Sequence, residues 1–389
     1  MSEILTTSDI TSCISALIAR NKLFAGKNLQ IYYITNKMAG CFTNKKVSSK
    51  YKKLFNSTEK QALQYPECSK SVYTKVFATE YAGHAKDLAN AVLSELIASF
   101  NEGDECILVT AGGDGTSLEV QTGLYLAAQS EPKKRNMIMN HLTLLRLPLG
   151  TGNDGTDGHS IEETFELLKG PLVFQNTRAL KIYPEGKRTD EDIKHLGKDP
   201  AKYCDVNYSA PWYCFNIASI GLDAYVVYLT NTIKKKMPGN LYQLCVPLSG
   251  LIYDKDFPVG NADIELFDDK GNLTEKLQTT VTLIAVGASG YRVYGGGHKV
   301  LPNHHNVCVA PKVSLFRLIR DNHMFIDGSF VGTDLASLHS GEKIRINYDK
   351  AILMQADGEV TMLCKEDFPI VIEKTEPCIR IVTSSSNLA

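Results

Sequence analysis

The sequence predicts an α/β protein in which a helix-covered parallel sheet is followed by a domain of antiparallel strands. Strand and helix signals alternate through about the first 170 residues, a pattern typical of a parallel sheet with helices on both faces. Beyond about residue 170, short β-rich runs alternate with turn residues, as in an antiparallel sandwich or barrel. The chain is long enough for two domains, each with its own hydrophobic core.

The first domain is predicted from apolar residues at strand and helix spacing. Between residues 80 and 100, Ala85, Ala89 and Val92 recur on what would be one helix face. A second helix is expected from Ser117 to about Ala128. The expected strands, rich in apolar and β-branched residues, are Leu29–Thr35, Ser71–Thr79, Glu105–Ala111 and Leu142–Gly150.

Composition narrows the class of protein. The formal net charge is −1, so no overall field attracts nucleic acid, and we expect no nucleic-acid partner. The ten cysteines form no CxxC pair, which favours buried thiols in a reducing compartment over disulfides or zinc sites. The sequence has neither a signal-peptide pattern nor an apolar run of the roughly 20 residues that span a bilayer. We therefore expect a cytoplasmic protein, peripheral to the membrane where it meets lipid.

A glycine-rich segment, "VTAGGDGTSLEV", joins a predicted strand to a predicted helix at Val109–Val120. In that context several backbone N–H groups and a helix N-terminus can point at one anion. The segment matches neither GxGxxG nor the Walker A pattern, so by itself it fits a phosphate loop and a plain tight turn equally well.

A second segment, "LPLGTGND" at Leu147–Asp154, again places Gly-Thr-Gly after a strand. Loops at the carboxyl ends of parallel strands meet at the same edge of the sheet. Two such loops could hold a polyphosphate together with Mg²⁺, for which Asp114 and Asp154 are the candidate ligands, directly or through water.

Over most of its length the sequence resembles the diacylglycerol kinase catalytic-domain superfamily, which includes bacterial lipid kinases and sphingosine kinases. A lone GGDG is shared with NAD kinases and phosphofructokinases, but here seven motifs occur in the family's order. In sequence they are "ITNKMAG", "ATEYAGHAKDLA", "GGDGTSLEVQTGL", "LPLGTGND", "CFNIASIGLDAYV", "YGGGHKVLPN" and "LMQADGEV".

The resemblance implies a Rossmann-like nucleotide-binding α/β domain, similar to those of phosphofructokinases and NAD kinases, and a C-terminal β-sandwich domain for the substrate. It places the first domain at residues 1–168, completed by 376–389, and the second at 169–375. Glu359 would be the base that accepts the substrate hydroxyl proton, with Asp114 as the alternative base. The residues implied in ATP binding are Asn36, Gly40, Thr79, Gly112, Gly113, Asp114, Gly115, Thr116, Glu119, Thr151 and Asn153.

The expected activity is ATP- and Mg²⁺-dependent phosphorylation of a hydroxyl of diacylglycerol or a related lipid, a sphingoid base included. Two alternatives stay open: an NAD kinase-like enzyme, and a non-catalytic regulator that binds nucleotide or lipid. The expected partners are ATP and a lipid at a membrane surface. A homodimer stays open too, because the sequence carries no signal of oligomeric state, and the acceptor lipid cannot be identified from sequence.

The sequence departs from the family pattern in places that bear on activity. "GTDG" follows Asp154 where an apolar residue, an alanine and a basic residue are usual, and Lys181 stands where bacterial relatives have an acidic residue. A separate hypothesis concerns residues 234–254, where three lysines precede a strongly apolar helix: this segment would gate or receive the lipid chain at an anionic membrane.

Overall fold

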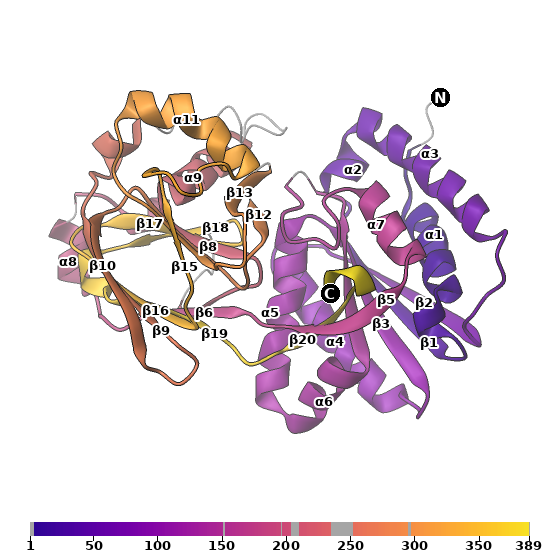
Figure 1. The fold of residues 1–389 in the computed structure, drawn as a ribbon. Coiled ribbons are helices and arrows are strands. Elements are labelled where there is room, and N and C mark those ends of the chain that lie inside the picture. Colours follow the sequence, from indigo (N-terminus) through magenta and orange to yellow (C-terminus); the bar gives the residue numbers. More distant parts are fainter. Residues whose placement is uncertain are drawn as a thin grey trace. The chain divides into compact units, whose positions relative to one another are not determined.

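The computed structural model describes residues 4–150, 152–195, 197–203, 210–234, 252–294 and 297–388. The chain divides into two compact units (Figure 1). Residues 1–177 and 377–389 form the first, and residues 178–376 form the second. The segment proposed to receive the lipid chain lies mostly outside the described residues, as does Thr151.

A six-stranded sheet forms the centre of the first unit, in the order β2-β1-β3-β4-β20-β5. The first five strands run parallel, and β5 pairs antiparallel with β20. Because of that pairing, residues 172–177 belong to the first unit, whereas the border expected from the family resemblance was residue 168. The strands are β1 Asn28–Thr35, β2 Ser71–Ala78, β3 Asp104–Gly112, β4 Leu142–Pro148, β5 Leu172–Thr177 and β20 Ile379–Ser384.

Helices cover both faces of this sheet, as predicted. On one face α1, α3 and α7 bury the odd-numbered positions of β1 and β3, among them Ile31, Tyr33, Ile107 and Val109. On the other face lie α4, α5 and α6. The helices are α1 Thr7–Arg20, η1 Lys22–Phe24, α2 Gly40–Thr43, α3 Lys45–Ala62, α4 His84–Ser99, α5 Asp114–Ser130, α6 Pro132–Asn140, α7 Ile161–Lys169 and η4 Ser385–Leu388.

Two six-stranded antiparallel sheets form the second unit, in the orders β10-β9-β16-β19-β6-β7 and β15-β14-β11-β8-β17-β18. Inward-facing residues such as Ile264, Ile346, Ile220 and Met354 form the core between them. This arrangement confirms the predicted C-terminal antiparallel domain, because alternate residues of each strand face the same core. The strands are β6 Leu180–Pro184, β7 Trp212–Cys214, β8 Ile217–Gly221, β9 Asn261–Phe267, β10 Leu273–Thr280, β11 Leu283–Gly287, β14 Val307–Ala310, β15 Ser337–His339, β16 Lys343–Tyr348, β17 Ile352–Ala356, β18 Glu359–Leu363 and β19 Ile370–Lys374.

A further layer packs on the outer face of the second of these sheets. Ile217, Ala285 and Leu353 point outward there and form a second core with apolar residues such as Val227 and Phe330. The remaining elements are the paired strands β12 Arg292–Tyr294 and β13 His298–Leu301, and the helices α8 Asp190–His195, η2 Pro200–Lys202, α9 Leu222–Lys234, α11 Leu315–Asp327 and η3 Lys365–Asp367. Within the described part of the chain, no helix combines the length and apolar character needed to cross a membrane.

Candidate functional site

The glycine-rich segment joins β3 directly to α5. β3 is buried throughout and ends at Gly112, and Gly113 is the N-cap residue of α5, which begins at Asp114. The predicted helix start at Ser117 was therefore wrong. Glycine and aspartate are weak helix formers, but the first N–H groups of any helix have no acceptor inside it, so such residues are tolerated in its first turn. That end of α5 can bind an anion.

The second glycine loop packs so closely against the start of α5 that the two backbones are in contact. A Cβ atom on Gly150 would lie 2.6 Å from the Cα of Gly113, closer than real Cβ contacts. A Cβ atom on Gly152 would collide with the carboxylate of Asp114. Glycine is thus required at position 150, where the clash is with backbone, and a Cβ atom at position 152 would displace the Asp114 carboxylate.

Asp114 ties the two loops together through hydrogen bonds. Its Oδ2 accepts from the backbone N–H of Asn153 at 2.7 Å, and its Oδ1 from that of Gly155 at 3.4 Å. Asn153 has a left-handed backbone, with φ of 63°, and its side-chain oxygen accepts from the N–H of Gly150 at 2.9 Å. Asparagine tolerates this conformation better than most residues. The Asp114 residue stays partly exposed, so one face of this junction is accessible.

Asn36 connects the turn after β1 to the same place. Its side-chain Nδ2 donates to the hydroxyl of Thr116 at 3.1 Å, and its backbone N–H donates to the carbonyl of Ala111 at 3.0 Å. The backbone N–H of Cys41, next to Gly40, donates to the carbonyl of Leu149. The ends of β1, β3 and β4 are therefore held as one hydrogen-bonded unit, in which Thr116 is buried and serves an internal contact.

Glu119 caps a neighbouring helix. Its two carboxylate oxygens accept from the N–H groups of Gly83 and Ala85, at 2.9 and 3.0 Å, at the N-terminus of α4. A carboxylate at that end satisfies orphan donors and opposes the positive pole of the helix. Through these two hydrogen bonds Glu119 fixes α4 relative to α5, the helix that begins at Asp114.

Thr79 follows β2, and its N–H donates to the carbonyl of Thr35 at the end of β1.

The "GTDG" departure has a structural role. Asp157 is buried and forms a bidentate ion pair with Arg146 of β4, with N···O distances of 2.6 and 3.2 Å. The Asp157 carboxylate also accepts from the backbone N–H of Arg146, and Gln121 of α5 accepts from the Arg146 guanidinium at 3.1 Å. A buried ion pair needs such complete hydrogen bonding to offset desolvation. This pairing anchors the glycine loop on β4, and sequence reasoning missed it.

Two carboxylates meet beside Gly152. An oxygen of Asp114 and one of Asp154 both lie within 4 Å of the position that a Cβ atom would take on Gly152. Among the described residues, no group of three or more His, Cys, Asp or Glu side chains is placed to hold a metal ion. One or two carboxylates completed by phosphate oxygens and water are what Mg²⁺ uses beside nucleotides, so this pair fits such an ion.

In the second unit, Asp357 organises the β17–β18 turn. Its carboxylate accepts from the backbone N–H groups of Phe215, Asn216 and Ile217 at 2.6 to 3.1 Å, and from the thiol of Cys214 at 3.1 Å. Burial raises the pKa of the Asp357 carboxyl, while these donors favour its charged form. The sequence motif singled out Glu359, but the hydrogen-bonding centre of this turn is the carboxylate of Asp357.

Glu359 is the first residue of β18, opposite Ala356 in the hairpin, and is partly exposed. The hairpin expected at Asp357-Gly358 is present, with both residues at positive φ.

Lys181, the second departure from the family pattern, lies on β6 and pairs across the sheet with Glu373, with an N···O distance of 3.7 Å. The lysine is thus accommodated by an acidic cross-strand neighbour.

Residues 30–182 match the family model of the diacylglycerol kinase catalytic domain. The resemblance to this superfamily is confirmed. The match spans the glycine segments and stops before the motifs around Asn216 and Glu359. No curated protein matches the sequence.

Solved structures support the same fold over most of the chain. A candidate diacylglycerol kinase from Bacillus anthracis strain Sterne superposes with a TM-score of 0.54 at 17% identity, covering 92% of this chain and 98% of that one. Another such structure from the same organism gives 0.52 at 16% identity, with coverages of 92% and 98%. A diacylglycerol kinase from this strain gives 0.50 at 15% identity, covering 92% and 97%. At such identities the likeness shows the fold, and it extends through both units.

Proposed function

We propose that this protein is an ATP-dependent lipid kinase that transfers the γ-phosphate to a hydroxyl of diacylglycerol or a related lipid. The observation that supports this most is the interlocking of two glycine loops around Asp114, inside the region that matches the diacylglycerol kinase catalytic domain. Phosphoryl transfer depends mainly on positioning and on neutralising phosphate charge, which a rigid cradle of backbone N–H groups suits.

The nucleotide phosphates would bind at the start of α5. Gly113 and Gly115 present backbone there without a Cβ atom, and Asn36 and Glu119 hold the neighbouring segments in place. In this proposal Gly40, Thr79, Thr151 and Asn153 complete the nucleotide site, and the buried Gly112 and Thr116 support it from within. Asp114 and Asp154 would hold Mg²⁺, which when bound neutralises charge on the phosphate oxygens.

The proton of the lipid hydroxyl needs a carboxylate acceptor, and we assign that role to Glu359, with Asp114 as the alternative. Asp114 already accepts two backbone N–H groups of the second glycine loop, which suits a positioning and metal-holding role. Glu359 begins a strand whose turn is fixed by the buried Asp357 carboxylate, and a fixed base is what general-base catalysis requires.

The test is transfer of labelled phosphate from ATP to a panel of diacylglycerols, sphingoid bases and NAD. We expect label in lipid, and Glu359→Gln to lower its rate by about 10²–10⁴-fold while ATP binding by calorimetry is unchanged. If Asp114 is the base instead, Glu359→Gln retains transfer and Asp114→Asn does not. Label in NAD, or nucleotide binding without transfer to any acceptor, would contradict the proposal.

A further inference from the structure

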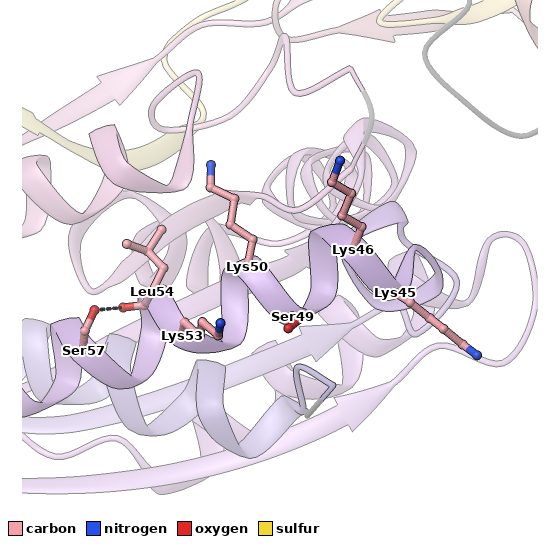
Figure 2. Close-up of a pocket in the computed structure, with 7 residues that line it drawn as sticks. All are labelled: Lys45, Lys46, Ser49, Lys50, Lys53, Leu54 and Ser57. Carbon is pink, nitrogen blue, oxygen red and sulfur yellow. Dashed lines mark hydrogen bonds between the residues drawn. The ribbon is translucent and has the colours of Figure 1, made fainter. Parts of the chain in front are cut away.

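The exposed face of α3 carries a dense group of lysines. Residues 45–57 include Lys45, Lys46, Lys50, Lys52 and Lys53 and contain no aspartate or glutamate, although the whole chain has a net charge of −1. Four of them, with Ser49, Leu54 and Ser57, line an open groove of 820 Å³ (Figure 2). We call Lys45, Lys46, Lys50 and Lys53 the α3 lysine face.

The helical repeat places these four lysines on one side of α3. At about 100° per residue they span an arc of roughly 140°. Ser48, Phe55, Thr58 and Ala62 are buried on the opposite side. There, the ring of Phe55 packs edge-on against Phe165 of α7, with ring centroids 5.1 Å apart. The apolar side of α3 is thus buried in the core, so a binding partner can contact only the lysine side.

Nearby acids neutralise only part of this charge. Lys50 lies 3.3 Å from Glu162, and that pair is solvent-exposed. Lys52 lies 3.5 Å from Asp9 and is largely enclosed. No ion pair to Lys45, Lys46 or Lys53 is found within the described part of the chain. Figure 2 shows Lys46 and Lys50 extending to the same side of the helix, with Lys45 reaching out from its first turn.

We propose that the α3 lysine face docks the first unit on an anionic lipid bilayer. Clusters of four or more lysines on an amphipathic helix attract anionic lipid headgroups, and each lysine near the surface contributes to binding. The side of α3 that could insert is buried in the core, so the docking is electrostatic and reversible. The inference rests on the proposed function, because a lipid kinase must reach a substrate held in a bilayer. It is independent of the lysines at 234–236.

The test uses the full chain without nucleotide, sedimented with vesicles of phosphatidylcholine alone or with about one third phosphatidylserine. We expect binding to the anionic vesicles only, weakening as added salt shortens the screening length. Replacing the α3 lysine face (K45Q/K46Q/K50Q/K53Q) should lower partitioning on the order of a hundredfold. The matched control K22Q/K27Q/K70Q/K133Q removes the same charge from exposed lysines elsewhere in the first unit and should bind as the unaltered protein does.

Three outcomes would overturn the proposal: equal binding to neutral and anionic vesicles, equal loss in both variants, or binding to a nucleic acid or an acidic peptide in preference to vesicles. A circular dichroism spectrum checks that the α3 variant is folded. Docking is measured without turnover, so it stands or fails separately from catalysis. If the proposed function holds as well, the α3 variant should phosphorylate a short-chain lipid in detergent micelles at an unchanged rate and lose activity only on vesicles.

Discussion

Each unit contains an aspartate whose carboxylate fastens a turn by accepting backbone N–H groups. Asp114 accepts from two residues of the second glycine loop, and Asp357 accepts from three consecutive residues before and at the start of β8. The two differ in the environment of the carboxylate. Both residues are partly exposed, but Asp114 lies at a helix N-terminus, whereas burial of its carboxyl group raises the pKa of Asp357.

The two carboxylates make similar hydrogen bonds, but we expect them to have different roles. A carboxylate with one accessible face can fix a loop and still meet a metal or a phosphate. A carboxylate that accepts from four donors, as that of Asp357 does, already serves to hold the turn in place. We therefore expect changes at Asp114 to act on activity and changes at Asp357 to act on stability.

The largest expected effect is on catalysis at Asp114. If the proposed function holds, Asp114→Asn should lower phosphoryl transfer from ATP by about 10²–10⁴-fold, because it removes a charge that would hold Mg²⁺ or accept the substrate proton. The free energy of unfolding should change by less than about 1 kcal/mol, since an amide oxygen can still accept one N–H group. Steady-state kinetics and urea unfolding on the same variant measure both. If Asp114→Asn kept full activity but lost stability, the proposed difference between Asp114 and Asp357 would be wrong.

The next effect concerns a carboxylate that is buried but paired with a cation. Glu105 of β3 contacts Arg380 of β20, and both side chains are buried. Arg380→Met should destabilise the first unit by about 3–5 kcal/mol, because it leaves Glu105 without its partner. Urea unfolding followed by circular dichroism measures the loss, and the double variant E105Q/R380M should recover part of it.

This pair also predicts a pH dependence. Burial raises the pKa of Glu105 from an ordinary 4.5 to about 7, against the attraction of Arg380. A raised carboxyl pKa means that stability is fullest below 4.5 and falls as the pH rises toward 7. In Arg380→Met the pKa rises further, so the loss should be larger at pH 8 than at pH 5. Glu105→Gln should abolish this slope, and an unchanged slope would contradict the assignment.

Asp357→Asn tests the role of the corresponding aspartate in the second unit, where we expect a loss of stability. Asparagine tolerates the left-handed backbone at this position, where φ is 48°, so the substitution isolates the hydrogen bonds. Its amide group would place a donor against a backbone N–H, costing about 1–3 kcal/mol. Trp212, the only tryptophan, lies on β7, whose last residue Cys214 contacts Asp357, and its fluorescence reports unfolding of the second unit. An unchanged transition would show that the buried carboxylate is dispensable.

The smallest effect is expected at Glu119. Glu119→Gln leaves one of the two N–H groups at the start of α4 facing another donor, which should cost about 1 kcal/mol. Hydrogen exchange should then be faster at the first amides of α4 and unchanged in α7. A loss of ATP affinity without faster exchange would indicate that Glu119 contacts the nucleotide directly.

Four strands of the first unit, β1 to β4, and two of its helices, α4 and α5, follow from local sequence. Val92 and its neighbours gave the helix, and the run around Ile107 gave the central strand, because apolar spacing reflects which face is buried. The start of α5 did not follow, since Gly115 and Asp114 read as a turn. The pairing of Arg146 with Asp157 could have been suspected from a buried arginine in a strand, which needs an acidic partner.

The sequence alone determined that two glycine loops follow neighbouring strands, and strand direction alone brings such loops to one edge of the sheet. Only the tertiary structure decided what each acidic side chain does there. The partners of Asp114 lie about 40 residues along the chain and those of Asp357 about 140. Hydrogen bonds over such separations exist only once the chain has folded, so no local pattern could show which backbone N–H groups each carboxylate would accept from.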